Sequence, residues 1–299
     1  IQSYGGKLMS PLIVGGRTVF GALSSHPTGI TTTAGSEYYD TTDSKMKFYD
    51  GTAWANVGGV ENFAGTDATH WWKSEGIASN TSWVAERGSL NFSAGGSGTL
   101  TLSTSDSNFN GHRTISQAAD QNRFLQAGGS GTNGTFWDST SAFSAILAIR
   151  KTSHIGGTWG DCLFVQQRNG QPDAGWAIDI EGDHTWNGSY GETFGNYGGF
   201  SFPQKGIMCV RCGASGANSQ VLWWPSGASS WTTLATGTNY PSSISNFYDG
   251  ICLFNFDGAT HNGHRYEGSY AEIGYFKNLR INDTTRDAWK DYLVEKFNF

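Results

Sequence analysis

The 299 residues are enough for one large β-sandwich or two modest domains, and enough to bury a sizeable hydrophobic core. A composition with 42 glycines, 12 tryptophans and only 15% charged residues favours an all-β fold with long connections over a helical one. The net charge of −6 without a basic run predicts no nucleic-acid partner. Because no apolar run approaches the roughly 20 residues that span a bilayer, we also expect no membrane insertion.

Residues 1 to about 35 show no sustained hydrophobic period, because glycines and prolines interrupt short apolar runs such as Leu12–Val14. We expect this part of the chain to be an extended arm that gains order from a neighbour.

The residues after this arm predict three short strands, Glu37–Tyr39, Lys45–Tyr49 and Thr52–Val57. Asp50 and Gly51, between the second and third, are typical of a two-residue type I′ hairpin. So small a sheet buries too little apolar surface to be stable alone, so it must pack on partner chains or on the rest of this chain.

The stretch Gly35–Trp54, GSEYYDTTDSKMKFYDGTAW, is similar to the module GSxYYNTTDxxxxxYNGTAW that is common in phage tail-fibre and other fibre proteins. In such proteins the module lies in the shaft or neck before the receptor-binding tip, and the fibres are commonly trimers. The resemblance implies a homotrimer whose N-terminal arm contacts other virion structural proteins.

A hinge at Val57–Val60 predicts an attachment and trimerisation module over residues 1–59 and a second domain over residues 60–299. In the second domain, short β-prone runs alternate with clusters of Gly, Asn, Asp and Ser at the spacing expected of a sandwich. These runs are Trp83–Ala85, Leu100–Leu102, Ser144–Ile149, Cys162–Val165, Trp176–Ile180, Ile207–Val210, Val221–Trp224 and Ile251–Phe254. About ten strands in this length is the scale of a jelly roll.

The C-terminal residues begin with the period of a half-buried strand. Ala271, Ile273 and Tyr275 fall on one face, and Glu272 and Phe276 on the other.

After Asn282 the period becomes helical. Apolar residues recur on one helix face at Trp289, Tyr292, Leu293 and Phe297. Thr284 followed by Asp287 has the form of a helix start, so we expect Thr284 to cap one short helix that packs on a sheet.

The phrases YAEIGYF (270–276) and DTTRDAWKDYLVEKF (283–297) resemble the end of the concanavalin A-like, or laminin-G-like, jelly-roll domains of phage virion proteins. Thr69–Lys73, Asn108–His112 and Asn122–Leu125 follow the order of phrases in that family. The resemblance implies a concanavalin A-like sandwich with one C-terminal helix, in a protein that is assembled in the host cytoplasm and located in the virion.

Three carboxylates, Asp179, Glu181 and Asp183, alternate along a predicted strand, so they project from one face about 6–7 Å apart. The pattern resembles the ExDxxE strand of concanavalin-like endoglucanases, but Asp179 stands in place of the nucleophilic Glu and Glu181 in place of the middle Asp. Catalysis, a cation-lined or glycan-contacting face, and a plain solvent-facing edge stay open for these residues, and we expect no catalysis.

The segment 184–200 interleaves aromatic residues with Gly, Asn and Ser, a composition suited to stacking on sugar rings and bonding their hydroxyls. The alternative is a long loop whose aromatics fold back on the sandwich. We predict carbohydrate binding by Asp179, Glu181, Asp183, His184, Trp186, Asn187, Tyr190 and Tyr197.

Other candidate sites have weaker patterns. Asp257, His261 and His264 have metal-ligand side chains, but the HxxH spacing spans a predicted turn, so we expect no metal site. Neither a P-loop, a dinucleotide-binding fingerprint nor a G-x-S-x-G motif is present, so we expect no cofactor.

The cysteines and the paired tryptophans favour packing roles. Cys209 and Cys212 have CxxC spacing but no second ligand pair, so we expect reduced, buried thiols. Trp223 and Trp224 point to opposite faces of a strand, so we expect core or interface packing, with at least one of them a candidate for exposure.

The sequence therefore predicts a non-enzymatic phage fibre protein whose β-sandwich binds host-surface glycan for attachment. One alternative is a purely structural capsid-decoration or tail-assembly protein. A less favoured alternative is a depolymerase that cleaves surface glycan with the carboxylates of residues 179–183.

Overall fold

The computed structural model describes short stretches of residues 1–66, mostly strands, and then residues 67–118, 123–129, 142–152, 162–168, 171–179, 203–213, 219–237, 249–254 and 266–299. In β16 and β17 only the backbone is described. The chain divides into two compact units, Ile1–Ala64 and Gly65–Phe299. No helix among these described residues is long and apolar enough to cross a membrane.

The N-terminal unit contains more strands than the sequence indicated. Its sheet has the order β3-β4-β5-β6-β7, in which β4 and β5 are parallel and the other pairs antiparallel. The strands are β1 (Ser3–Tyr4) and β2 (Lys7–Leu8), which pair with each other, β3 (Leu12–Val14), β4 (Arg17–Leu23), β5 (Glu37–Asp40), β6 (Lys45–Tyr49) and β7 (Trp54–Asn56). Within the stretch that we expected to be an extended arm, β3 and β4 are strands that gain their hydrogen bonds from each other and from β5.

The hairpin between β6 and β7 also differs from the prediction. Tyr49 pairs with Trp54, so four residues lie between the paired positions instead of two, and the two-residue turn at Asp50 and Gly51 was wrong. This register places the Trp54 ring 4.9 Å from the ring of Tyr38, edge to face, in the small core of this unit. The aromatic pair outweighs the local turn signal.

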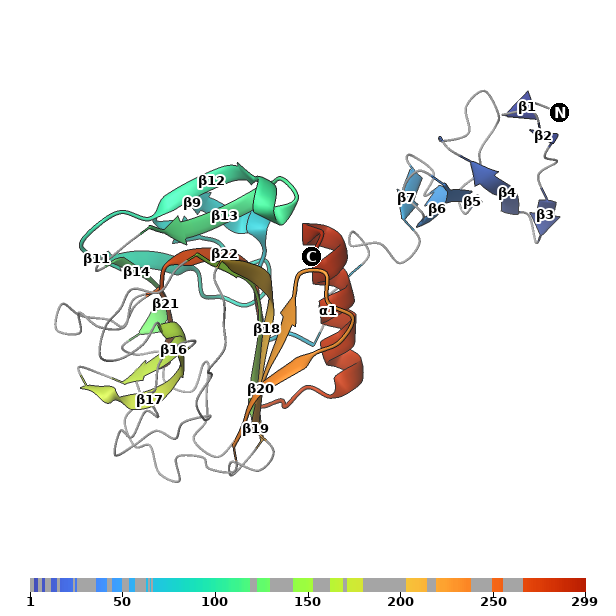
Figure 1. Ribbon diagram of the computed structural model, residues 1–299. Coiled ribbons are helices and arrows are strands. Elements are labelled where there is room, and N and C mark those ends of the chain that lie inside the picture. The colour runs from blue at the N-terminus through green and yellow to red at the C-terminus, as the bar shows by residue number, and fades with distance from the viewer. Residues whose placement is uncertain are drawn as a thin grey trace. The chain divides into compact units, whose positions relative to one another are not determined.

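The C-terminal unit is a sandwich of two antiparallel sheets (Figure 1). The first sheet has the order β17 (Gln171–Asp179), β16 (Cys162–Arg168), β21 (Asp249–Leu253), β14 (Arg123–Gly129), β11 (Phe92–Gly96), β10 (Ser82–Trp83) and β9 (Ile77–Ser79). The second has the order β12 (Thr101–Asp106), β13 (His112–Gln117), β22 (Gly268–Lys277), β15 (Phe143–Lys151), β18 (Gln204–Cys212), β19 (Ser219–Pro225) and β20 (Thr232–Gly237), and β8 (His70–Trp72) also pairs with β22.

The main core fills the space between these sheets. It is a cluster of buried apolar side chains from both sheets, among them Trp72, Trp83, Phe92, Leu125, Phe143, Leu147, Ile251 and Tyr275. Burying several aromatic side chains of this size provides most of the stabilisation of such a sandwich.

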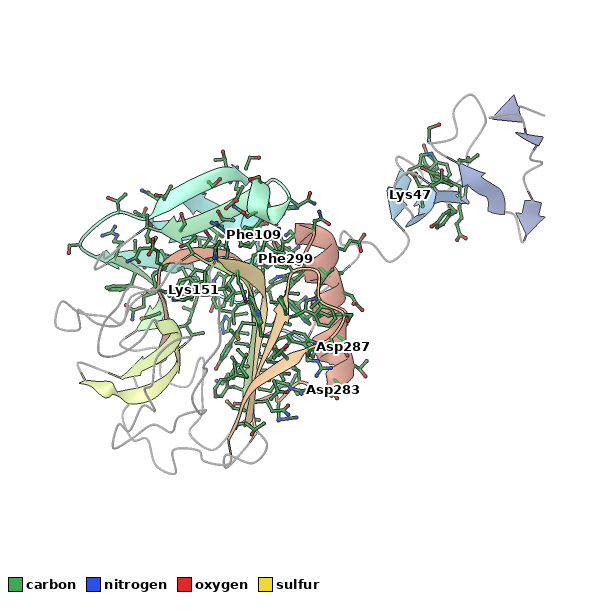
Figure 2. All side chains as sticks on the ribbon, in the orientation of Figure 1. Lys47, Phe109, Lys151, Asp283, Asp287 and Phe299 are labelled. Carbon is green, nitrogen blue, oxygen red and sulfur yellow. The ribbon has the colours of Figure 1, made fainter. Side chains whose placement is uncertain are left out.

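The helix α1 (Asp283–Phe297) forms a third layer, on the outer face of the second sheet (Figure 1). The predicted apolar face is confirmed, because Trp289, Tyr292, Leu293 and Phe297 are all buried. At the C-terminal end, Phe299 packs 5.5 Å from Phe109, so the chain end also closes on the hairpin between β12 and β13 (Figure 2).

The predicted helix cap was wrong by two residues. Asn282 is the N-cap, and its side-chain oxygen accepts a hydrogen bond of 2.8 Å from the backbone N–H of Thr285. Thr284 lies inside the first turn. Asp283 and Asp287, also in the first turns, bond instead to Arg211 and Trp231, which anchor this end of the helix on β18 and beside β20 (Figure 2).

The helix changes the environment of the strands beneath it. We expected residues 270–276 to be half-buried, but every residue of β22 from Gly268 to Phe276 is buried, because α1 covers the face turned away from the core. For the same reason both Trp223 and Trp224 are buried: Trp223 lies in the main core, and Trp224 lies under Lys290 of the helix, 4.5 Å from its ammonium nitrogen. No tryptophan of this pair is exposed.

The predicted fold class, an all-β sandwich with one short C-terminal helix, is confirmed by these layers.

Candidate functional site

Most of the predicted carbohydrate-binding residues lie outside the described residues. Asp179 is the last residue of β17, where its backbone pairs with that of Cys162. The others fall in the segment 180–202, outside the described part: Glu181, Asp183, His184, Trp186, Asn187, Tyr190 and Tyr197. The carbohydrate-binding assignment of these residues stays a prediction.

The strands that flank this segment are described, and they locate its two ends. In the second sheet Gln204, where β18 begins, pairs with Lys151, where β15 ends, and Lys151 pairs with Gly268, where β22 begins. Gln117, the end of β13, also pairs with Gly268. These four strand ends therefore lie at one end of the sandwich.

The first sheet ends at the same place. Phe164 near the start of β16 pairs with Leu253 at the end of β21, and Leu253 pairs with Leu125 near the start of β14. The backbone of Tyr266, just before β22, donates a hydrogen bond of 2.8 Å to the carbonyl of Phe254, just after β21, and so joins the two sheets here. Four connections between the sheets therefore start and finish at this end of the sandwich: 118–122, 152–161, 180–203 and 254–267. Asp257, His261 and His264 fall in the last one, outside the described residues.

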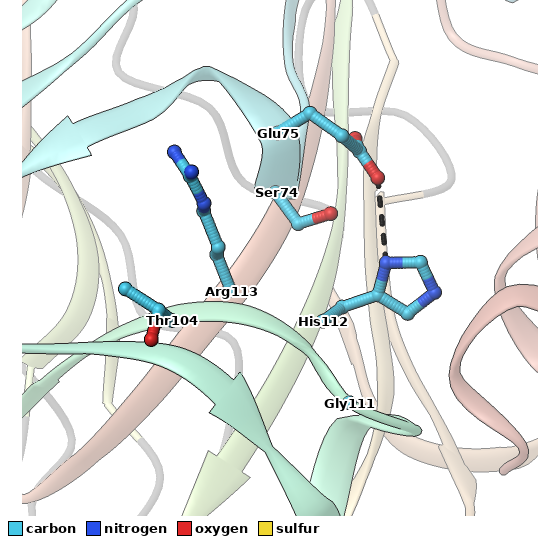
Figure 3. A pocket seen from close by; sticks show the side chains of 6 residues that line it. All are labelled: Ser74, Glu75, Thr104, Gly111, His112 and Arg113. Atoms are coloured by element: carbon cyan, nitrogen blue, oxygen red, sulfur yellow. Dashed lines mark ion pairs between the residues drawn. The ribbon is translucent and has the colours of Figure 1, made fainter.

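A pocket that the sequence did not predict lies between the short helix η2 (Ser74–Gly76) and the hairpin of β12 and β13 (Figure 3). Its volume is about 250 Å³. The lining residues carry hydroxyl, carboxylate, imidazole and guanidinium groups, and they are Ser74, Glu75, Thr104, Gly111, His112 and Arg113.

Glu75 is held by two basic side chains. Its Oε1 lies 3.3 Å from Nδ1 of His112, and its Oε2 accepts a hydrogen bond of 2.8 Å from Nζ of Lys296. Partial burial by itself raises the pKa of this carboxyl, but the hydrogen bonds from His112 and Lys296 outweigh it and hold the pKa well below its ordinary value. Glu75 is therefore an ionised acceptor in the pocket wall.

Behind the pocket, Lys296 reaches a second carboxylate that is completely buried. Glu272 accepts hydrogen bonds of 2.7 Å from the Trp71 indole, 2.6 Å from the Tyr292 hydroxyl and 2.7 Å from Lys296. Burial raises the pKa of Glu272, against the opposing attraction of Lys296. Burial also raises the pKa of Tyr292, so its hydroxyl keeps its proton and donates it. With three donors on a fully enclosed side chain, Glu272 anchors α1 to β22 and has no face left for a substrate.

The cysteines behave as predicted where they are described. Cys209, Cys212 and Cys252 are free and buried, so the CxxC spacing joins no disulfide between its two members. Burial raises the pKa of the Cys209 thiol to about 12. Within the described part of the chain no group of three His, Cys, Asp or Glu side chains is arranged to hold a metal ion.

Sequence reasoning missed the pocket because its residues come from two segments that only the folded chain brings together. Ser74 and Glu75 follow β8, whereas Thr104 and His112 belong to a hairpin about 30 residues later. The one available signal was the polar run Asn108–His112, which indicates a turn but not what faces it.

No protein-family model matches the sequence, and no curated protein matches it. The chain is similar in structure to domain 4 of AbnA, a GH43 extracellular arabinanase from Geobacillus stearothermophilus, with a TM-score of 0.47 and 11% identity over 74% of this chain and 98% of that one. It is also similar to the binding domain of botulinum neurotoxin serotype G, with a TM-score of 0.44 and 11% identity over 76% of this chain and 51% of that one. A Trypanosoma rangeli sialidase gives a TM-score of 0.40 and 13% identity over 77% of this chain and 33% of that one.

This chain therefore spans about half the length of the toxin domain. At such low identity these similarities concern the fold and say nothing of a shared ligand.

Proposed function

We propose that this chain is a non-enzymatic binding protein of a phage fibre or appendage, whose β-sandwich attaches to carbohydrate on a host surface. The observation that carries the proposal is the position of the segment 180–203, which starts and finishes at the end of the sandwich where four connections between the sheets gather. Connections gathered at one end of a rigid sandwich are a common site of recognition, because the strands fix their ends while their sequences remain free to vary.

The composition of this segment favours sugar over other ligands. Trp186, Tyr190 and Tyr197 offer ring faces for stacking, and the Gly, Asn and Ser residues between them offer hydrogen bonds to hydroxyls. The net charge of −6 opposes an anionic polymer as the main partner, so a neutral or weakly charged glycan suits the chain better.

A binding role suits the described ionisable groups better than catalysis does. Glu272 and Lys296 form an ion pair of 2.7 Å whose side chains are almost completely enclosed, and they serve to hold α1. A glycosidase needs two carboxyl groups about 5–9.5 Å apart on either side of an accessible bond, and this pair supplies one enclosed carboxylate and a cation.

The virion role is supported by the resemblance of Gly35–Trp54 to a fibre module. Such modules precede receptor-binding tips in trimeric fibres, so three identical weak sugar sites on one fibre would gain avidity from being held together. The small sheet of this unit, with a core formed around Tyr38 and Trp54, has the size of a structure that partner chains complete.

The test is adsorption of the labelled full chain to host cells and to their extracted surface polysaccharide. We expect saturable binding that free polysaccharide competes away, and strong weakening in Trp186→Ala and Tyr190→Ala. Leu279→Ala is the control, because this side chain is 41% exposed on the sandwich unit and lies outside the segment 180–203.

Other outcomes would contradict the proposal. Absence of adsorption by a trimeric sample would favour the structural capsid-decoration or tail-assembly role. Release of soluble sugar products that stops in Glu181→Gln would instead establish the depolymerase.

A further inference from the structure

We propose that the pocket lined by Ser74, Glu75, His112 and Arg113 is a second carbohydrate site, which takes one neutral monosaccharide unit of the glycan. This inference rests on the proposed function and adds to it a ligand class and a site whose lining residues lie outside the segment 180–203.

The first support is an unsatisfied hydroxyl. Ser74 is completely buried, and its Oγ has no hydrogen-bond partner among the described residues. Figure 3 shows this hydroxyl turned toward Glu75 and His112, on the pocket side. A buried hydroxyl without a partner destabilises the folded protein, and a ligand that supplies the missing hydrogen bond removes this penalty.

The second support is the mixture of donors and acceptors around that hydroxyl. Each oxygen of Glu75 receives one bond, from His112 or Lys296, and a carboxylate oxygen accepts two. Arg113 donates one N–H to the carbonyl of Ile77 at 3.1 Å, and a guanidinium carries five. The pocket therefore offers remaining acceptors and remaining donors side by side.

The charges of these groups select against ionic ligands. A carboxylate or phosphate would be attracted by Arg113 but repelled by the ionised Glu75. A cation would be repelled by Arg113 and by Lys296, which already pairs with Glu75. Sugar hydroxyls carry no charge, and each one both donates and accepts, so vicinal hydroxyls match this alternation.

The size of the pocket limits the ligand. Its volume of about 250 Å³ is just below the range of roughly 300–1,000 Å³ that holds drug-sized ligands. One sugar ring fits this space better than a longer oligosaccharide does.

The side chains of β12 provide a matched pair for the test. Thr104 lines the pocket, while Thr101, another exposed threonine of the same strand, is not among the lining residues. Thr101→Val therefore changes the same strand without changing the pocket lining.

The experiment uses saturation-transfer NMR on the full chain with methyl glycosides of glucose, galactose, mannose and N-acetylglucosamine, and with glucuronate and inorganic phosphate as charged probes. We expect at least one neutral glycoside to bind, with affinity roughly tenfold weaker in Ser74→Ala and in His112→Gln and unchanged in Thr101→Val. Thermal unfolding of each variant shows whether it is folded. Thr104→Val, at an exposed position, gives a second test of the pocket if Ser74→Ala does not fold.

Several results would overturn this inference. Glycoside binding that Ser74→Ala and Thr104→Val leave unchanged would place the glycoside outside this pocket, and binding of glucuronate or phosphate alone would contradict the neutral ligand. If polysaccharide adsorption is lost in Trp186→Ala but no glycoside enters the pocket, the inference fails and the proposed function stands. If neither polysaccharide nor glycoside binds, both fail.

Discussion

The ammonium nitrogen of Lys296 lies 2.7 Å from Oε2 of Glu272, and both side chains are almost completely shielded from water. This ion pair joins the last turn of α1 to the middle of β22. Removing one partner of a buried pair leaves an uncompensated charge, whereas replacing both with apolar groups of similar size is often nearly neutral.

We therefore expect Glu272→Leu to lower the free energy of unfolding by about 3–5 kcal/mol. The double variant Glu272→Leu/Lys296→Met should recover only part of that loss, because the Trp71 indole and the Tyr292 hydroxyl lose their acceptor in both variants. Urea denaturation measures both. Asp291→Ala, at a 71% exposed side chain of the same helix, is the control and should stay within about 0.5 kcal/mol of the wild type. A double variant no more stable than the single one would show that the pair is not the unit of stabilisation.

We predict that the packing of β22 against α1 requires a glycine at position 274. A Cβ at this position would lie 2.7 Å from the ring of Trp289, closer than two carbon atoms approach without a shift. Gly274→Ala should cost about 1–3 kcal/mol through overpacking between β22 and α1. In Trp289→Leu the same substitution should cost much less, since the ring is gone. Equal costs in the two backgrounds, measured by urea denaturation, would contradict this contact.

The helix cap gives a sharp comparison between two neighbouring residues. Asn282→Ala should destabilise the protein by about 1 kcal/mol, because it removes the bond to the N–H of Thr285. Thr284→Ala, inside the first turn, should change the unfolding free energy by less than about 0.5 kcal/mol. If thermal or urea unfolding showed Thr284→Ala to be more destabilising than Asn282→Ala, Thr284 would be the cap.

The lowered pKa of Glu75 predicts that part of the free energy of unfolding is lost in acid. Its pKa in the folded state is below the ordinary value of 4.5, so its contribution is fully present above that value and is lost as the pH falls toward the folded pKa. The stability difference between the wild type and Glu75→Gln should therefore be constant from about pH 7 to about pH 5.5 and shrink at lower pH. Urea denaturation of both proteins across this pH range measures the stability difference. A difference that grows on acidification would contradict a lowered pKa of Glu75 in the folded state.

The buried cysteines should be inert in the folded protein. Because burial raises the pKa of the Cys209 thiol to about 12 and that of Cys212 further, neither forms a thiolate at neutral pH. In a Cys162→Ser background, which removes the one cysteine whose side chain is not described, Ellman's reagent should label no thiol until denaturant is added. Fast labelling before unfolding would indicate an accessible CxxC pair.

The sequence by itself determined the elements whose signal is local. Short β-prone runs bounded by turn residues identified the strands Ser144–Ile149 and Ile207–Val210, and the 3.6-residue period identified the buried face of α1. Each of these patterns is complete within a few neighbouring residues.

Only the tertiary structure decided what depends on contacts between distant segments. It buried Glu272 beneath Lys296 and gave β22 two covered faces, because the helix packs on the outer face of the sheet and no local pattern encodes that position. It also formed the pocket of Ser74 and His112, since these residues become neighbours only when η2 packs beside the hairpin of β12 and β13. For the segment 180–203 the contributions are reversed. Its sequence suggests a ligand, whereas the structure locates only the strand ends that flank it.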